Sequence, residues 1–131
     1  MSSGLIDTSV VVDWDDGAVQ AALPDEVAIS TFSLAELAAG PHLASNASER
    51  ARRQARLQQA EGLFEPLDFD RAAARSFGLI VATIVAARRS HRIRIADLLI
   101  AAVAHANGLD LYTRNPRDLA GLDALLVVNS V

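Results

Sequence analysis

Three acidic residues suggest chemistry because of the chain around them. Asp97 lies inside the apolar run IRIADLLIAAVA, where an uncompensated charge is costly. Asp7 ends the apolar run GLID, and Glu36 lies in TFSLAELAA. Each acid also has an ordinary interpretation: a turn or cap for Asp7, a solvated helical position for Glu36, and a helix-dipole or salt-bridge role for Asp97.

Carboxylates that face one another repel, and burying them together raises their pKa values. A divalent cation removes this conflict. Mg²⁺ and Mn²⁺ prefer oxygen ligands, and Mg²⁺ keeps several waters and accepts phosphate oxygens. Such a cation lowers the pKa of a bound water and neutralises charge that develops on a phosphate. The three acids therefore indicate metal-dependent phosphate chemistry, provided that the fold gathers them.

The elements that must position these acids follow from apolar runs and capping residues. Strands are predicted at residues 4–7, 27–30, 109–113 and 125–128, with extended chain at 64–69. Helices are predicted from Thr8-Ser9 through Trp14 and at 31–39, 45–62, 70–89 and 95–107, with a loop or short helix at 115–121. Thr8-Ser9 and Ser33 are the expected N-caps and Gly108 the expected C-cap. The helix at 70–89 has an apolar middle that should be largely buried.

Alternating strands and helices indicate an α/β fold, one domain over residues 1–131 with a parallel sheet and helices on both of its faces. Ligands bind such sheets at the C-terminal ends of the strands. Asp7 and Glu36 follow the first two strands, and Asn115 and Asp118 follow the strand LDLYT. Asp97 can join them from the first turn of its helix. The sequence therefore predicts that these side chains meet at one edge of the sheet.

Composition excludes several classes of site. The chain has 131 residues, of which 51% are hydrophobic, so a folded core is expected. Zero cysteines exclude disulfides and thiolate catalysis, and the three histidines have no close spacing. The net charge of −4 argues against a protein that coats nucleic acid, although a nuclease with an acidic metal site is compatible with it. No secretory signal or membrane span is evident, so a soluble, cytoplasmic protein is expected.

The order and setting of the acids resemble the PIN-domain family, in particular the VapC-type toxins of toxin–antitoxin systems. The resemblance rests on LIDTS, SLAEL, ADLLIAA and TRNPRDL and covers nearly the whole chain. It implies a PIN-like three-layer α/β/α fold with a central parallel sheet. It also implies an endoribonuclease that uses Mg²⁺ or Mn²⁺ to cleave single-stranded or looped RNA, such as tRNA or rRNA. By position, Asp7, Glu36 and Asp97 match the metal-binding acids of the family.

The fourth acidic position of the family is occupied here by Asn115. An asparagine offers a neutral oxygen to a metal-bound water but no charge, so a weaker metal site or a positioning role is expected. Asp118 either supplies the missing carboxylate or caps a local turn. The hydroxyls of Thr8, Ser9 and Thr113 either orient waters or cap the local chain.

Arginine supplies all twelve basic residues, and two of these flank the predicted site. Arg114 and Arg117 are the expected phosphate contacts, since guanidinium matches phosphate geometry. The arginines at positions 50, 52, 53 and 56 either contact RNA or a partner or form a solvated helix face, the more common case. Trp14 is expected in the core rather than against a base. The family resemblance further implies a VapB-type antitoxin that blocks the acidic site, and a homodimer.

Other functions remain as alternatives. A receiver domain and a P-loop both need a lysine, which the chain lacks, and there is no G-x-G-x-x-G motif. Asp13-Trp14-Asp15 mimics the D-x-D of a phosphatase family, which would require a strand at residues 9–12. A PIN-like module that binds RNA or protein without cleavage is suggested by Asn115, but the three remaining acids favour catalysis.

Overall fold

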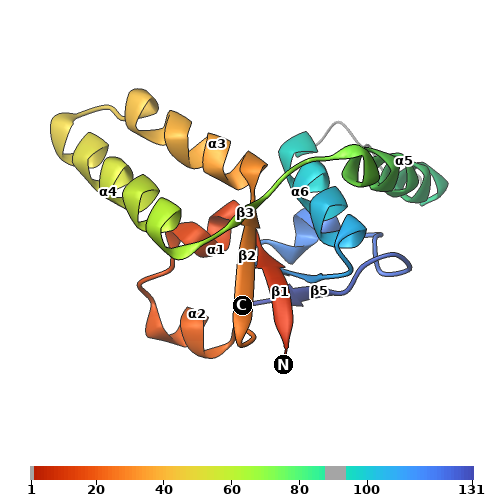
Figure 1. The fold of residues 1–131 in the computed structure, drawn as a ribbon. Coiled ribbons are helices and arrows are strands. Elements are labelled where there is room, and N and C mark those ends of the chain that lie inside the picture. Colours follow the sequence, from red (N-terminus) through yellow and green to blue (C-terminus); the bar gives the residue numbers. More distant parts are fainter. Residues whose placement is uncertain (1, 88–93) are drawn as a thin grey trace.

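The computed structural model describes residues 2–87 and 94–131. Its centre is a five-stranded parallel sheet with the strand order β3-β2-β1-β4-β5 (Figure 1). The strands are β1 (Ser3–Ile6), β2 (Glu26–Ser30), β3 (Pro66–Leu67), β4 (Asp110–Thr113) and β5 (Val128–Ser130). At the centre of the sheet, Leu5 of β1 pairs with Ala28 on one side and with Leu111 on the other.

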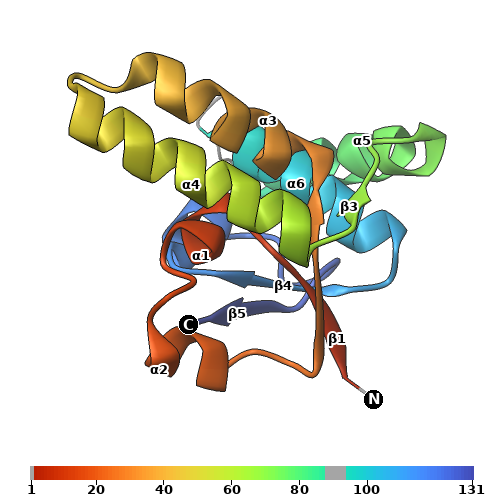
Figure 2. The ribbon, with the colours of Figure 1, turned by 60° about the vertical axis from the view of Figure 1, so that its left-hand side comes forward.

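Helices connect the strands and cover both faces of the sheet. They are α1 (Thr8–Val12), α2 (Gly17–Ala21), α3 (Thr31–Ala39), α4 (Ala47–Leu63), α5 (Arg71–Ala86) and α6 (Ile95–Ala106), with 3-10 turns η1 (Gly40–Leu43) and η2 (Pro116–Leu119). Figure 2 shows α3 and α4 side by side above α1. None of the helices in the described residues is long and apolar enough to cross a membrane.

Alternation along β1 divides the core into two layers. Successive strand residues point to opposite faces, so Leu5 and Ile6 enter different clusters. Leu5 packs with residues of α5 and α6 such as Ile80 and Ile100. Ile6 packs with residues of α1 and α3, including Val10 and Leu37. This arrangement confirms the predicted three-layer α/β/α fold with a central parallel sheet.

The two helix caps next to the sheet lie earlier in the chain than expected. Asp7, not Thr8-Ser9, is the N-cap of α1, and its carboxylate accepts from the backbone N–H of Val10. Ser30, not Ser33, is the N-cap of α3, and its hydroxyl accepts from the Ser33 N–H at 3.1 Å. Both corrections have one cause: each strand passes directly into its helix, so the last extended residue becomes the cap.

Three element predictions need correction. The last strand is β5 at Val128–Ser130 rather than 125–128, because Leu126 turns into the core and its N–H binds the carbonyl of Leu122. Helix α2 was not predicted, although Asp16 caps it. The middle of α5 is not largely buried, since one face packs on α6 while Leu79 and Val85 remain 52% and 59% exposed. Arg88, Arg89 and most of the basic loop, including His91, lie outside the described residues.

The phosphatase alternative depended on a strand at residues 9–12. These residues belong to α1, and Asp13 is the C-cap of that helix. Asp13-Trp14-Asp15 therefore follows a helix and lies in a turn, rather than ending a strand. The backbone for a D-x-D phosphatase site is absent here, and that alternative is wrong.

Gly4 is required by the close approach of β1 to β4. A Cβ at this position would lie 2.5 Å from Cε1 and 2.8 Å from Cδ1 of Tyr112. We expect Gly4→Ala to lower the free energy of unfolding by about 1–3 kcal/mol, because the Tyr112 ring must move within a paired sheet. Urea denaturation measures this change. The matched control is Gly62→Ala in α4, where nothing lies within 4 Å and alanine should stabilise the helix by up to about 1 kcal/mol; equal effects of the two substitutions would contradict the account.

Candidate active site

The predicted acids come from separate elements at the C-terminal edge of the sheet. Asp7 directly follows β1, and Glu36 lies in α3, which begins directly after β2. Asp97 lies in the first turn of α6, and Asp118 lies in η2, shortly after β4. The parallel topology therefore places all four at the end of the sheet where ligands of such folds bind.

Asp7 is the most buried of these acids, with 5% of its surface exposed. Its backbone N–H donates to the carbonyl of Tyr112 at 3.1 Å, which fixes the residue against β4. Its Oδ1 accepts from the Ser9 hydroxyl at 2.5 Å and from the Val10 N–H at 3.3 Å. Within the described part of the chain, Oδ2 accepts no hydrogen bond. One oxygen of Asp7 thus holds the cap of α1, and the other can serve a cation.

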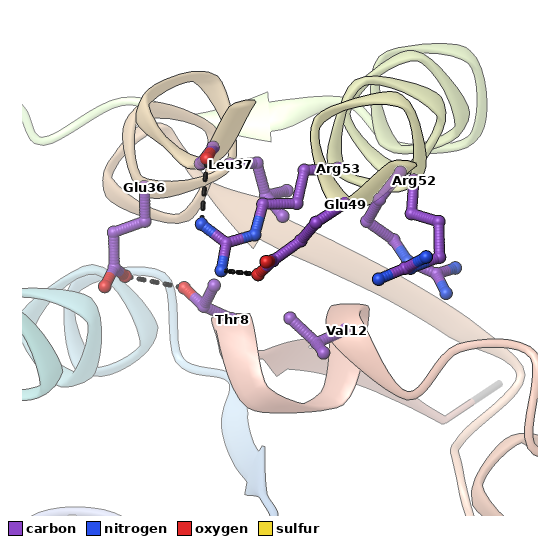
Figure 3. A pocket seen from close by; sticks show the side chains of 9 residues that line it. Thr8, Val12, Glu36, Leu37, Glu49, Arg52 and Arg53 are labelled. Atoms are coloured by element: carbon purple, nitrogen blue, oxygen red, sulfur yellow. Dashed lines mark hydrogen bonds and ion pairs between the residues drawn. The ribbon is translucent and has the colours of Figure 1, made fainter. Parts of the chain in front are cut away.

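Glu36 is exposed and is held by a hydroxyl of α1. The Thr8 hydroxyl donates to Glu36 Oε1 at 2.6 Å (Figure 3). It is also hydrogen-bonded to the buried Ser33 hydroxyl at 3.0 Å. This chain of hydrogen bonds ties α1 to α3 and orients the carboxylate. Thr8 was expected either to orient waters or to cap α1; in the structure it positions Glu36.

Asp97 has the strongest electrostatic signature in the site. Its pKa is raised from 3.8 to about 6, first by burial and then by the negative charges of Asp7, Asp118 and Glu36. Arg94 opposes this shift by favouring the charged carboxylate. The charge of Asp7, which lies 90 positions away in the sequence, therefore affects the protonation of the Asp97 carboxyl. The electrostatic effect shows that the fold brings these four carboxylates into one neighbourhood.

The two candidates for the fourth acidic position, Asp118 and Asn115, have different surroundings. Asp118 is half-buried, contributes to the raised pKa of Asp97, and forms an ion pair with Arg94 at 3.6 Å. Asn115 is exposed, and its backbone N–H binds the Thr113 hydroxyl at 3.0 Å. No hydrogen bond among the described residues ties the Asn115 side chain to the acids. Arg94 was overlooked in the sequence, where it reads only as part of a basic loop.

The two predicted phosphate contacts differ in their surroundings. Arg114 already has partners within the protein, because its Nε pairs with Asp13 at 3.1 Å and its Nη1 donates to the Val131 carbonyl at 2.9 Å. Arg117 is exposed on η2. A phosphate can therefore meet Arg117 directly, whereas Arg114 must exchange a partner. Trp14 packs edge-on against Phe64, with 5.0 Å between the ring centroids; it was expected in the core, and it lies partly buried against the core cluster.

The chemistry of the donor set fits a hard divalent cation. Four carboxylates supply oxygen ligands, and the pKa of Asp97 is raised first by burial and then by the other three carboxylates, an effect that Arg94 opposes only in part. As placed, no three Asp, Glu or His side chains in the described ranges converge closely enough to surround one ion. Glu36 is exposed and can turn about its own side-chain bonds. By their chemistry, Asp7, Asp97 and Glu36 offer the carboxylate oxygens that Mg²⁺ or Mn²⁺ prefers.

Comparison with known proteins agrees with the fold. The PIN domain family model matches residues 4–125. Ribonuclease VapC5 of Mycobacterium tuberculosis is 36% identical over 99% of this chain and 95% of its own length, and Ribonuclease VapC4 of that organism is 33% identical over 95% and 94%. The crystal structure of VapBC-5 from the same organism superposes with a TM-score of 0.87 and 34% identity over 100% of both chains. The crystal structure of FitAcB from Neisseria gonorrhoeae superposes with a TM-score of 0.79 and 26% identity over 96% of both chains.

Proposed function

This chain belongs to the PIN domain family, and from that premise we propose that it is a Mg²⁺- or Mn²⁺-dependent endoribonuclease, the toxic component of a toxin–antitoxin pair. The observation that carries the proposal is the half-buried Asp97, whose charge is opposed by Asp7, Glu36 and Asp118 at the ligand-binding edge of the sheet. A site of this kind is destabilised by its own charge and is relieved by a divalent cation. Relatives named as ribonucleases support RNA as the substrate.

The residues divide the work of phosphodiester hydrolysis. Asp7, Asp97 and Glu36 hold the metal, which when bound activates water and neutralises charge on the phosphate. Asp7 is held at the start of α1 by its cap hydrogen bonds, which preorients one ligand, whereas Glu36 accepts from Thr8 but stays exposed, so it can turn toward the metal. Asp118 positions water near Asp97 through its charged carboxylate oxygens, and Asn115 does so through its neutral amide oxygen.

Arginines at the edge of the site serve the substrate. We assign phosphate contacts to Arg117 and, after release from Asp13, to Arg114. Guanidinium groups bind phosphate through paired hydrogen bonds, which suits positioning of the RNA backbone. The proposed substrates are structured RNAs such as tRNA or rRNA, cut in single-stranded or looped segments.

The proposal includes two protein partners. Solved structures similar to this chain include VapBC complexes from M. tuberculosis and Salmonella typhimurium. We propose that a VapB-type antitoxin covers the acidic edge and that the chain, one PIN domain over residues 1–131, forms a homodimer. A non-catalytic module that binds RNA or protein is the second candidate, favoured only by Asn115 at the fourth acidic position.

Cleavage by a Glu36→Gln variant tests the assigned metal site. We expect a loss of at least about tenfold in the rate, because the amide keeps an oxygen for Thr8 but removes a charge from the metal site. Purified protein free of antitoxin is incubated with total tRNA and rRNA in Mg²⁺ or Mn²⁺, or with EDTA. Glu65→Gln is the control, since that exposed residue precedes β3, the outermost strand beside β2, and is not among the assigned site residues. Equal rates for wild type and Glu36→Gln would remove Glu36 from the site, and RNA binding without cleavage would favour the non-catalytic module.

A further inference from the structure

A groove of about 470 Å³ opens between α1 and the hairpin formed by α3 and α4 (Figure 3). One end of the groove is lined by Thr8 and Glu36, which belong to the candidate active site. Apolar lining comes from Leu37 and from Val12, whose side chain is 52% exposed and faces α4 across the groove. The groove therefore begins at the acids and continues away from them over an apolar surface.

Arginines of α4 form the outer rim of this groove. Arg53 is neutralised by an ion pair with Glu49, and it also donates to the Gly40 carbonyl at 2.9 Å. It therefore joins η1 to α4 and has a structural role. Arg56 forms an ion pair with the exposed Asp15 at 3.3 Å. Arg56 is partly buried and also hydrogen-bonds Gln59, but Asp15 is largely exposed, so the pair is weak and Arg56 can exchange Asp15 for a phosphate.

Arg52 differs from both of these neighbours. It is exposed, and its Nη1 donates to the Ser48 hydroxyl at 2.9 Å. No carboxylate of the described residues lies within ion-pair distance of Arg52. Arg52 and Arg56 also line a second hollow of about 440 Å³ that continues from the groove toward Asp15. An uncompensated positive charge thus stands where the two hollows meet.

We infer that this groove, defined by Thr8, Val12, Glu36, Leu37 and the rim of α4, holds the RNA strand that flanks the cleaved phosphodiester, with Arg52 as its main phosphate contact and Arg56 as a second. The inference rests on the proposed function. A single strand offers what the groove needs: phosphates for the arginines and exposed base faces for the apolar lining at Val12 and Leu37. An acidic peptide would match the arginines but would leave the apolar lining uncovered.

Binding of a labelled RNA tests this inference. The probe is a fluorescein-labelled single-stranded oligoribonucleotide of about 12 nucleotides, bound to the Asp97→Asn protein at several salt concentrations so that cleavage does not interfere. Adding Arg52→Gln should raise the Kd at least about fivefold and lower the slope of log Kd against log salt by about 0.7, the value for one released phosphate contact. Adding Arg56→Gln as well should lower the slope again.

The matched control is Arg50→Gln, which removes an exposed arginine of α4 that lines a separate hollow with His42 and Asn46. It should change the Kd by less than about twofold, since residues two positions apart on a helix do not share a face and Arg50 lines a different hollow. Equal losses for Arg50→Gln and Arg52→Gln would overturn the groove in favour of a diffuse charge effect. An unchanged Kd and salt slope for Arg52→Gln would also overturn it. If Arg52→Gln weakened binding of the antitoxin but not of the RNA, the groove would be assigned to protein.

Failure of the inference is separable from failure of the proposed function. If wild type cleaves RNA and Arg52→Gln cleaves it with the same KM, the enzyme stands and the groove is overturned. If wild type never cleaves RNA yet its binding depends on Arg52, the groove stands and catalysis fails. If wild type neither binds nor cleaves RNA, both are overturned. Thermal unfolding of each variant, followed by circular dichroism, confirms that it is folded.

Discussion

Asp97→Asn is expected to abolish metal-dependent RNA cleavage while making the metal-free protein more stable at neutral pH. The cleavage rate should fall at least about a hundredfold, because a ligand that carries charge to the metal is lost. Stability should rise because burial and three neighbouring carboxylates raise the pKa of Asp97 to about 6. Held ionised at neutral pH, this half-exposed group costs the fold about 1–2 kcal/mol after allowance for solvent screening.

Because the pKa of Asp97 is raised in the folded state, its effect on stability depends on pH. Below about pH 4 the Asp97 carboxyl is protonated in both the folded and unfolded states, so it carries no penalty. Between about pH 4 and pH 6 the folded state binds the proton of Asp97 more tightly than the unfolded state does. This preferential protonation stabilises the folded state, and the stabilisation is lost as the pH rises through the folded pKa. Urea denaturation should therefore show wild type and Asp97→Asn converging in acid and separating near neutrality.

Metal provides a second readout for the same variant. At neutral pH, Mn²⁺ should raise the melting temperature of wild type, because a ligand that binds only the folded state stabilises it, and should leave Asp97→Asn nearly unchanged. A variant that is less stable than wild type at neutral pH would contradict the electrostatic account. A variant that still cleaves RNA at the wild-type rate would remove Asp97 from the metal site.

Asp7→Asn and Asp7→Ala should separate the two roles of Asp7. Asparagine is as good an N-cap as aspartate, so Asp7→Asn should keep the hydrogen bond to Val10 and change stability by less than about 0.5 kcal/mol. Its cleavage rate should nevertheless fall at least about a hundredfold, since the charge of a metal ligand is lost. Asp7→Ala should be equally inactive and should also lose about 1–2 kcal/mol of stability.

Urea denaturation and RNA cleavage, measured on both variants, check this prediction. Asp16→Asn, at the cap of α2, is the control for capping without catalysis, because that residue lies outside the acidic edge. It should be active and nearly as stable as wild type. If Asp7→Asn remained active, Asp7 would be a cap alone, and the metal site would lose its most buried ligand.

The sequence contained enough information to predict the core of the fold and the edge of the sheet at which the candidate acids lie. Short apolar runs predicted strands, because a strand buried on both faces is apolar throughout, and the parallel topology then predicted that Asp7 and Glu36 follow strands at the same edge. Asp97 stood out because an acid in an apolar helix is costly without a role. These arguments depend on local chemistry and on one general rule about sheet edges.

The features that could not be predicted from the sequence depend on tertiary contacts. Residues 125–128 are apolar enough for a strand, yet Leu126 is drawn into the core by a turn at Leu122. The apolar middle of α5 gave no sign that Leu79 would remain exposed, because the helix packs on one face only. The choice between Asn115 and Asp118 could not be settled from spacing, since it depends on which side chain η2 turns toward Asp97.

The most direct test of the central claim is RNA cleavage by antitoxin-free wild type and Asp97→Asn, run side by side with total tRNA and rRNA in Mg²⁺, Mn²⁺ or EDTA. We predict that wild type cleaves with either metal, that EDTA stops it, and that Asp97→Asn is inactive under every condition. Cleavage by wild type that persists in EDTA, or that Asp97→Asn performs equally well, would contradict the account.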